Sequence, residues 1–147
     1  MMQARDVGLV ADLHAACFTE EGWDAQTIAE LLAMAGGFGL WASAGASHRP
    51  LGLVLARAIA GECVIFSLGV RPANRRCGIG RRLLLTALDM AAARGATRAY
   101  LEVAEDNEPA RCLYMDQGFA IIGSRPNYYR RQDTYASNAV TFGRDLT

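Results

Sequence analysis

Residues 74–84 of the chain read NRRCGIGRRLL, in which two glycines and four arginines precede a run of apolar residues. Two glycines spaced one residue apart at the start of a helix indicate a backbone that another group approaches closely. From about Gly78 to Arg94 the apolar residues fill one side of a helical wheel and polar residues fill the other, and Gly95 supplies the stop. The stretch therefore predicts a loop that leads into an amphipathic helix, and it leaves open what the loop holds.

The rest of the chain alternates between strand and helix patterns on both sides of this helix. Helices are predicted at 6–17, from about 24 to 36 and at 109–117, and strands at 38–43, 51–58, 62–70, 97–103, 119–123 and 135–146. Hairpins beside one strand–helix–strand crossover point to an α/β fold, a mixed sheet covered by helices. At 147 residues the chain has the length of one domain with its own core, so we expect a single domain over 1–147.

Local signals refine this outline. Asp6 stands where it can cap the first helix, and Gly69 inside a strand pattern is compatible with a β-bulge. The Pro126-Asn127 pair signals a turn. Very little sequence precedes the first helix, so we expect any opening strand to be short.

Composition limits the partners. Lys plus Arg and Asp plus Glu both number 15, so a net charge of zero gives no general attraction to nucleic acid or to an anionic membrane. The arginines beside the glycines are a local exception that suits a small anionic ligand. No apolar run approaches the roughly 18 residues that cross a bilayer, and the N-terminus lacks a signal-peptide layout, so we expect a cytoplasmic protein with reduced thiols. The four cysteines form no C-x-x-C pair and only two histidines accompany them, which argues against a zinc site.

Three phosphate-binding interpretations compete for the loop that carries Gly78 and Gly80, which we call the glycine loop. A nucleoside-triphosphate loop needs G-x-x-x-x-G-K-[ST], and the chain has no Gly-Lys pair. Gly78 and Gly80 fit the first half of the dinucleotide fingerprint G-x-G-x-x-G, and Glu102 lies where a ribose-binding acid belongs. Leu83 replaces the third glycine, however, and the loop 71–76 lies between the preceding strand and the first glycine, whereas that fingerprint follows its strand directly. The third interpretation is a cradle for a diphosphate, in which the unpaired N–H groups of residues 76–81 and the helix dipole face the anion. A tight turn with solvated arginines is the alternative without a ligand.

The loop does not stand alone. R-x-x-G-x-G, residues 75–80, follows a predicted strand and resembles the acetyl-coenzyme A loop of the GCN5-related N-acetyltransferases (GNAT). Residues 101–119, LEVAEDNEPARCLYMDQGF, resemble the second half of that family, with Asn before a helix and L-Y-x-x-x-G-F at its end. NYY at 127–129, Trp23 and the Glu of LEV are similar to the family's ribosomal-protein-alanine N-acetyltransferase (RimI-type) branch. The likeness covers nearly the whole chain and is strong at 68–119.

This resemblance implies a fold, a cosubstrate and a set of residues. The fold is a central, mostly antiparallel sheet of about six to seven strands with a splayed parallel pair, flanked by about four helices. The cosubstrate is acetyl-CoA, and no metal is involved. The residues that the resemblance implies for binding it are Leu68, Gly69, Val70, Arg75, Arg76, Cys77, Gly78, Ile79, Gly80, Arg81, Asn107 and Tyr114. Val70 would offer the N–H that receives the carbonyl oxygen.

Glu102 is the candidate general base. It is one residue out of phase with Leu101 and Val103, so on a strand it faces the other way. In the family branch the matching Glu takes the proton, usually through water, and the alternative is a surface or paired glutamate. An α-amino group has a pKa near 7.7–8.0, so roughly a tenth or more of it is neutral at pH 7, against about one in two thousand for a lysine side chain. A carboxylate base therefore suits an N-terminal amine better than a lysine.

Tyr114 is the candidate general acid, because a phenol of pKa near 10 can protonate a thiolate whose thiol has a pKa near 8.5. Its alternative role is packing in the core. Asn107 fits a helix cap as well as a cofactor contact. Trp23, Tyr128 and Tyr129 are candidates for the walls of a peptide entrance, and their alternatives are a loop staple and strand-edge packing.

The resemblance therefore implies an acetyl-CoA-dependent N-acetyltransferase in which the amine attacks directly, without a covalent acyl-enzyme. Its acceptor would be a protein N-terminal α-amine, such as the alanine of a small-subunit ribosomal protein. We expect a monomer or weak dimer with no nucleic-acid or membrane partner. Two alternatives stay open: a GNAT enzyme that acts on a small-molecule amine or a lysine side chain, and a non-catalytic acetyl-CoA-binding sensor or partner subunit.

Overall fold

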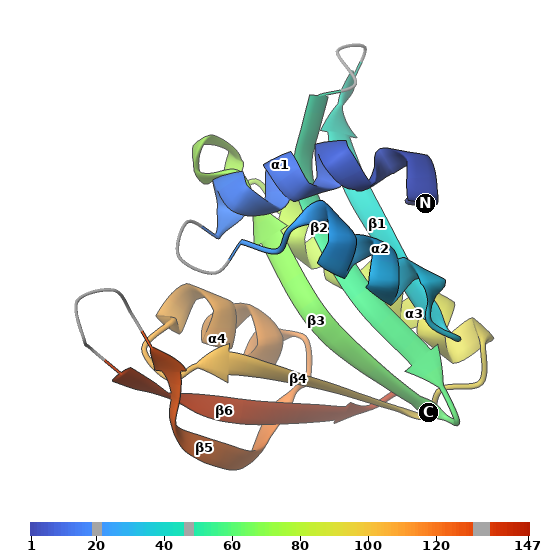
Figure 1. Cartoon of the computed structure of the whole chain (residues 1–147). Coiled ribbons are helices and arrows are strands. Elements are labelled where there is room, and N and C mark those ends of the chain that lie inside the picture. Colours follow the sequence, from blue (N-terminus) through green and yellow to red (C-terminus); the bar gives the residue numbers. More distant parts are fainter. Residues whose placement is uncertain (19–21, 46–48, 131–135) are drawn as a thin grey trace.

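The computed structural model describes residues 1–18, 22–45, 49–130 and 136–147, with the backbone alone for 125–130 and 136–137. Helices and strands alternate along the chain much as predicted (Figure 1). The elements are α1 (Val7–Cys17), α2 (Ala25–Ala33), β1 (Gly37–Ala44), β2 (Arg49–Ile59), β3 (Glu62–Val70), α3 (Ile79–Ala93), β4 (Arg98–Ala104), α4 (Glu108–Asp116), β5 (Ala120–Arg130) and β6 (Ala136–Asp145). Short 3₁₀ turns precede α1 and follow β3.

The six strands form one sheet in the order β1-β2-β3-β4-β6-β5. All neighbouring strands run antiparallel except β3 and β4, which are parallel because α3 connects them as a crossover. This mixed sheet, with one parallel pair and four α-helices in the part of the chain that is described, confirms the predicted fold class.

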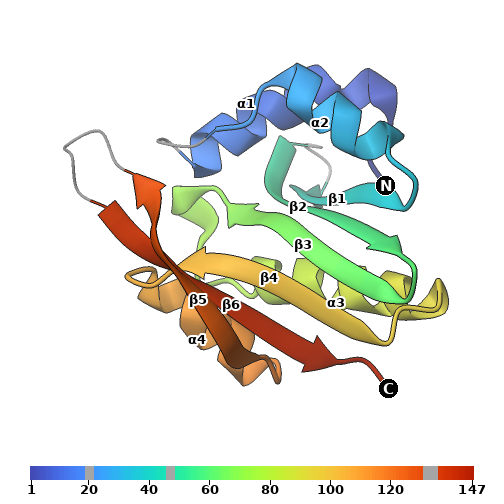
Figure 2. The same ribbon diagram turned by 60° about the horizontal axis from the view of Figure 1, so that its bottom comes forward.

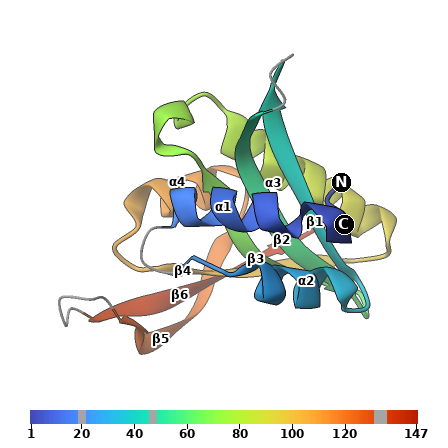
Figure 3. The ribbon, with the colours of Figure 1, turned by 45° about the horizontal axis from the view of Figure 1, so that its top comes forward.

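The helices cover the two faces of the sheet unequally. In Figure 2, α1 and α2 lie over β1–β3, whereas α3 and α4 lie under the sheet, and Figure 3 shows the same two N-terminal helices across β1–β3. The larger apolar core lies on the α3–α4 face and includes Leu84 and Phe142, both fully buried. The smaller core lies under α1 and α2 and includes Leu13 and Leu55. The described helices leave the β4–β6 part of the α1–α2 face uncovered (Figure 2).

A β-bulge interrupts β3 in its middle. Consecutive residues 55 and 56 of β2 are opposite Ser67 and Ile65, so Phe66 is an extra residue on β3. A bulge of this kind bends its strand and directs two successive side chains to one face of the sheet. Phe66 and Ser67 therefore both point to the α1–α2 face.

Gly69 is not the site of the bulge; the prediction for this residue is wrong. Its missing side chain instead makes room for the end of α1, because a Cβ at Gly69 would lie 2.7 Å from the Phe18 ring and 2.9 Å from Cys17 Cβ. The glycine thus lets α1 pack directly on the backbone of β3.

Two other local predictions are also wrong. Asp6 precedes α1 without capping it: its carboxylate accepts a hydrogen bond from the Gln3 N–H at 2.9 Å and so closes the 3₁₀ turn Ala4–Asp6. The Pro126-Asn127 pair does not make a turn but lies inside β5, where the register shifts between Arg125 and Tyr129. Proline has no N–H to donate to a neighbouring strand. It is tolerated here because β5 is an edge strand and its pairing with β6 is irregular at this point.

The short segment before α1 is attached to the sheet at one point. The Met2 N–H donates to the Gly39 carbonyl of β1 at 2.9 Å, and the Met2 side chain is buried in the smaller core, on the α1–α2 face of β1. A Cβ at Gly39 would lie 2.5 Å from the Met2 sulfur, so the glycine provides the space for that side chain. Among the described residues, this main-chain bond and the buried Met2 side chain stand in place of the opening strand that the sequence predicts to be short.

Candidate functional site

The two parallel strands separate halfway along their length. β3 pairs with β4 only from Glu62↔Arg98 to Ile65↔Leu101. Beyond that point β3 continues beside β2 as far as Val70, and β4 continues beside β6 as far as residue 104. We call the diverging segments, 66–70 of β3 and 102–104 of β4, the fork. Its position explains the splayed parallel pair that the sequence resemblance implies, because the bulge bends β3 away where the pairing stops.

Backbone groups of β3 point into the fork. The Arg71 N–H donates to Leu51 O of β2 at 2.8 Å. Because N–H groups alternate in direction along a strand, those of Leu68 and Val70 point away from β2, toward the side that β4 no longer occupies. The fork therefore offers a row of main-chain donors and acceptors to whatever lies between the strands.

The glycine loop supplies further donors at the end of β3. In the part of the chain that the structure describes, the N–H groups of residues 76–81 donate no hydrogen bond, and the first bond of α3 runs from the Arg82 N–H to Gly78 O at 3.1 Å. Arg76 and Gly78 both have positive φ angles, 65° and 80°, which turn successive amides outward. These amides and the positive end of the α3 dipole make a site for an anion.

Packing does not explain the second glycine of the loop. A Cβ at Gly80 would make ordinary contacts, 3.7 Å from Leu113 of α4 and 3.7 Å from Val70. Gly80 also has no positive φ angle. The residue thus lies where α3, α4 and the end of β3 converge, and its missing side chain keeps that space free.

The arginines of the loop divide into two groups. The Arg75 guanidinium donates to Val70 O at 3.1 Å and to Cys17 O at 3.3 Å, so it joins β3 to the end of α1. Arg76 and Arg81 are exposed. Their guanidinium groups can therefore reach an anion at the loop, whereas that of Arg75 has a structural role that the sequence does not predict. The exposed Cys77 thiol lies 3.6 Å from Arg75 O.

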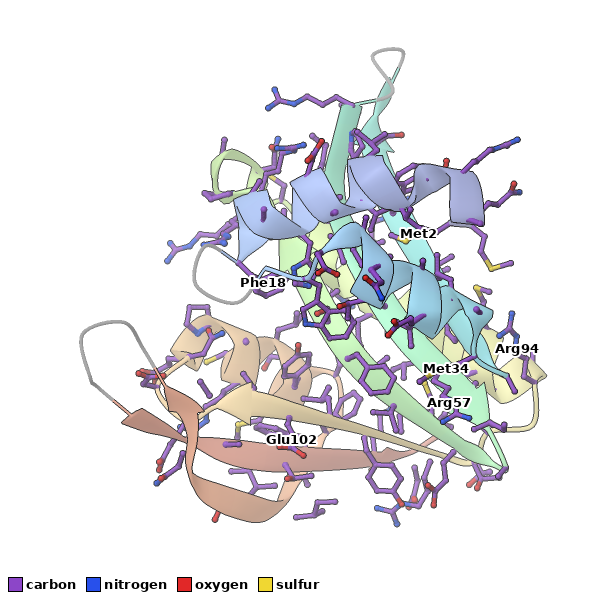
Figure 4. The ribbon with its side chains drawn as sticks, in the orientation of Figure 1. Met2, Phe18, Met34, Arg57, Arg94 and Glu102 are labelled. Carbon is purple, nitrogen blue, oxygen red and sulfur yellow. The ribbon has the colours of Figure 1, made fainter. Side chains whose placement is uncertain are left out.

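Glu102 lies on β4 where the fork begins, on the face opposite the core residues Leu101 and Val103, as its position in the sequence predicts. It is opposite Thr141 of β6, and one of its carboxylate oxygens, Oε2, is shielded from solvent. Figure 4 shows Glu102 on the β4–β6 part of the sheet and Phe18 at the end of α1.

Tyr114 and Asn107 lie on the other side of the fork, in and before α4. Tyr114 is 6% exposed, and its ring packs against Phe119 and Phe142 at centroid distances of 5.9 and 6.0 Å. Asn107 caps α4 by accepting a hydrogen bond from the Ala110 N–H at 3.3 Å. The packing role of Tyr114 and the capping role of Asn107 are therefore both real, whatever further role each residue has.

An aromatic cluster lies on the α1–α2 face beside the fork. Trp23, in the segment between α1 and α2, is 5.5 Å from the His14 ring and 6.4 Å from the Phe66 ring, and the Phe18 ring is 4.6 Å from His14. His14 is 1% exposed, and burial lowers its pKa to about 4, so its imidazole is neutral at pH 7. Its Nε2 lies 2.9 Å from Ser67 Oγ, and its Nδ1 accepts a hydrogen bond from the Trp23 N–H at 3.0 Å.

Sequence reasoning misses His14 and Ser67, since one histidine in a helix and one serine in a strand form no spacing pattern. It places Trp23 near the site, and the structure brings that residue to the fork side of α1. Tyr128 and Tyr129 lie in β5 by their backbone, and their side chains are outside the described residues.

Among the residues that the structure describes, no three His, Cys, Asp or Glu side chains are grouped so that they could hold a metal ion. Within the same ranges, no helix has both the length and the apolar character needed to span a membrane.

Comparison with protein families gives a match over most of the chain. Residues 9–119 match the acetyltransferase (GNAT) family. Among curated proteins, the chain is 44% identical over 84 residues to N-alpha-acetyltransferase RimI of Mycobacterium tuberculosis, covering 57% of this chain and 49% of that protein. It is 38% identical over 79 residues to the [ribosomal protein bS18]-alanine N-acetyltransferase of Haemophilus ducreyi, covering 54% of each. The chain thus spans about half the length of these two relatives.

Solved structures share the fold at lower identity. The ribosomal-protein-S18-alanine N-acetyltransferase of Escherichia coli has a TM-score of 0.89 at 22% identity, over 99% of this chain and 91% of that one. Ard1 of Thermoplasma volcanium has a TM-score of 0.83 at 24% identity, over 99% and 95% of the two chains. A chain of the NatC complex bound to Gag peptide and CoA has a TM-score of 0.83 at 19% identity, over 99% and 96%.

Proposed function

Because this chain belongs to the acetyltransferase (GNAT) family, we propose that it is an N-acetyltransferase that moves an acetyl group from acetyl-CoA to the α-amine of a protein N-terminus. The curated relatives named for RimI and for ribosomal protein bS18 support this acceptor class. We propose the N-terminal alanine of a small-subunit ribosomal protein as the specific acceptor, and residues 1–147 as one catalytic domain.

The observation that carries the proposal is the continuity of main-chain donors from the fork to the start of α3. The unbonded amides of residues 76–81 suit a diphosphate, and the outward-pointing groups of Leu68 and Val70 suit the amide-containing arm of coenzyme A. Gly80 fits the same ligand, because a side chain there would occupy the space where the loop, α4 and β3 meet. Arg76 and Arg81 would add charge-assisted contacts to the phosphates.

Residues along this path are proposed to hold acetyl-CoA. They are Leu68, Gly69, Val70, Arg75, Arg76, Cys77, Gly78, Ile79, Gly80, Arg81, Asn107 and Tyr114. The thioester supplies the acetyl group, and the Val70 N–H would donate to its carbonyl oxygen, where negative charge develops during the attack of the amine. Cys77 would contribute its main-chain N–H, which is one of the unbonded amides. Arg75 would hold the loop in position, since its side chain is bonded to β3 and α1.

Two side chains are proposed to move protons. Glu102 would take a proton from the acceptor amine, since it lies at the start of the fork on the face that the described helices leave open. Tyr114 would donate a proton to the leaving thiolate from the opposite side of the fork. An α-amine has a substantial neutral fraction at pH 7, so one carboxylate suffices as its base. Trp23, Tyr128 and Tyr129 are proposed as walls of the acceptor entrance.

Calorimetry with coenzyme A and Gly80→Ala protein tests the binding site. The variant has room for its Cβ, so it should fold with unchanged thermal stability yet bind coenzyme A at least tenfold more weakly, a cost of about 1.4 kcal/mol. Gly8→Ala is the matched control, because a Cβ at that position on α1 meets nothing within 4 Å. No heat from coenzyme A with the wild-type protein would overturn the proposal.

The acceptor class needs a separate assay. Thiol release is measured with a peptide that begins with alanine, with the same peptide acetylated at its N-terminus and carrying an internal lysine, and with small amines. We expect turnover of the first peptide alone. A preference for lysine or for a small amine would reject the N-terminal acceptor, and binding of coenzyme A without thiol release from any acceptor would indicate a non-catalytic sensor or partner subunit.

A further inference from the structure

We propose that His14 is a positioning residue for the acceptor side of the fork, because its one imidazole ring holds both the Trp23 segment and the Ser67 hydroxyl in place. The proposal rests on the proposed function and adds a residue to it. His14 contacts the fork at Ser67 and does not extend into the space between the strands, so it acts through Ser67 and Trp23.

The two hydrogen bonds of His14 allow only one form of the ring. The Trp23 N–H is a donor, so Nδ1 must offer its lone pair to it. A neutral imidazole then carries its proton on Nε2, which donates to Ser67 Oγ at 2.9 Å. A second proton on Nδ1 would face the Trp23 N–H directly. Both bonds therefore exist together only when the imidazole is neutral and has the Nε2–H tautomer.

This arrangement directs the hydroxyl of Ser67. Since Ser67 Oγ accepts the proton of His14, its own O–H is left to donate elsewhere. The bulge at Phe66 places Ser67 on the α1–α2 face, and the strand registers place Glu102 on that same face. Ser67 is next to Leu68, whose main-chain groups point into the fork. The Ser67 hydroxyl is thus oriented on the face from which an acceptor would approach Glu102.

The same ring also holds the aromatic cluster of Trp23, Phe18 and Phe66 in place. His14 is stacked on Trp23 with an interplanar angle of 23°, and Trp23 in turn reaches Phe66. Within the described residues, the Trp23 main chain makes one hydrogen bond, the one to His14. Removing that bond would free Trp23 to move relative to β3, whereas the glycine loop, which leads into α3, makes no hydrogen bond to His14, Trp23 or Ser67 among the described residues. The expected defect is therefore in the use of the acceptor and not in the use of acetyl-CoA.

Two variants separate the two bonds. His14→Asn places an amide oxygen near the position of Nδ1 and so keeps the acceptor for Trp23, but it cannot reach Ser67. His14→Gln places an amide nitrogen near the position of Nε2 and so keeps the donor for Ser67, but it loses the acceptor for Trp23. Ser67→Ala removes the hydroxyl and leaves the ring.

Steady-state kinetics with an alanine-initiated peptide is the first test. We expect KM for the peptide to rise roughly two- to twelvefold in each variant, the effect of one hydrogen bond, with KM for acetyl-CoA unchanged. Ser67→Ala should add nothing in the His14→Asn background, where that bond is already lost, and should raise KM again in the His14→Gln background. Lower thermal stability with wild-type KM values for both substrates would overturn the proposal.

Nuclear magnetic resonance gives a readout that does not depend on activity. In protein labelled with ¹⁵N at histidine, His14 should show the Nε2–H tautomer at pH 7, and the Trp23 amide should exchange slowly in wild type and His14→Asn but rapidly in His14→Gln. An Nδ1–H tautomer, or equal exchange in all three proteins, would overturn the link. If wild-type protein acetylates no peptide N-terminus, the proposed function fails, and this measurement still decides whether His14 joins the Trp23 segment to β3.

Discussion

Acid should destabilise the protein through His14, and the structure gives the size of the effect. The ring is 1% exposed, and burial alone lowers its pKa from 6.5 to about 4. The groups that contact it, Phe18, Trp23 and Ser67, carry no charge. The neighbouring Cys17 thiol has a pKa raised by burial, so it stays protonated in acid. Histidine is therefore the group in this cluster that changes charge between pH 4 and 6.5.

The sign of the effect follows from which state binds more protons. Between pH 6.5 and 4 the unfolded chain takes up a proton on His14 while the folded protein does not, so stability falls as the pH falls through this window. A pKa shift from 6.5 to about 4 corresponds to about 3 kcal/mol. The full contribution is present above pH 6.5, and nearly all of it is lost at pH 4.

Urea denaturation followed by tryptophan fluorescence measures this loss at a series of pH values. His14→Gln is the control, because it cannot titrate and retains every carboxylate of the wild type, including Asp24, whose pKa the Thr27 N–H lowers. The wild-type free energy of unfolding, minus that of the variant, should fall by about 3 kcal/mol from pH 7 to 4. If the two proteins lose stability in parallel, the imidazole is already protonated or is exposed in the folded state, and the reasoning is refuted.

Two further predictions concern stability alone. Phe142→Ala should cost about 3–5 kcal/mol in the free energy of unfolding, because it removes a fully buried ring that packs on Tyr114; a cost under about 1 kcal/mol in urea titration would mean that the core refills the space. Gly78→Ala should lower the free energy of unfolding by about 1–2 kcal/mol, because its φ of 80° strains any residue with a side chain although the space is open. Gly8→Ala in α1 is its control and should be neutral or stabilising, so equal losses in the two variants would argue against backbone strain.

The fold was predictable where local patterns agree with each other. The strand at Glu62–Val70, the helix that follows the glycine loop and the crossover to β4 all have the period that their structure requires. Glu102 faces away from its neighbours because a regular strand alternates. The same rule fails at Ser67: alternation from the buried Ile65 would turn Ser67 into the α3–α4 core, but the extra residue Phe66 reverses it.

The contacts that cross the fold could not be predicted from the sequence. His14 and Ser67 are 53 residues apart, and their hydrogen bond depends on where α1 lies on the sheet. Gly69 illustrates the same point, because its missing side chain serves the packing of Phe18 and Cys17 and not the geometry of its own strand. Arg75 is a third example. The sequence shows that the loop is basic, but only the folded structure shows that the Arg75 guanidinium donates a hydrogen bond to Cys17 O.

The fork has a consequence for the stability of the whole sheet. An open sheet of six strands normally has two edges, but here the separation of β3 from β4 adds two internal edges, whose amides have no neighbouring strand among the described residues. If acetyl-CoA binds in the fork as proposed, it would lie where a strand is absent and would bind the folded state alone. Its presence at a hundred times its dissociation constant adds about 2.7 kcal/mol to the free energy of unfolding. On the proposed function, occupancy and architecture would thus be coupled, because acetyl-CoA bound in the fork would make the sheet continuous.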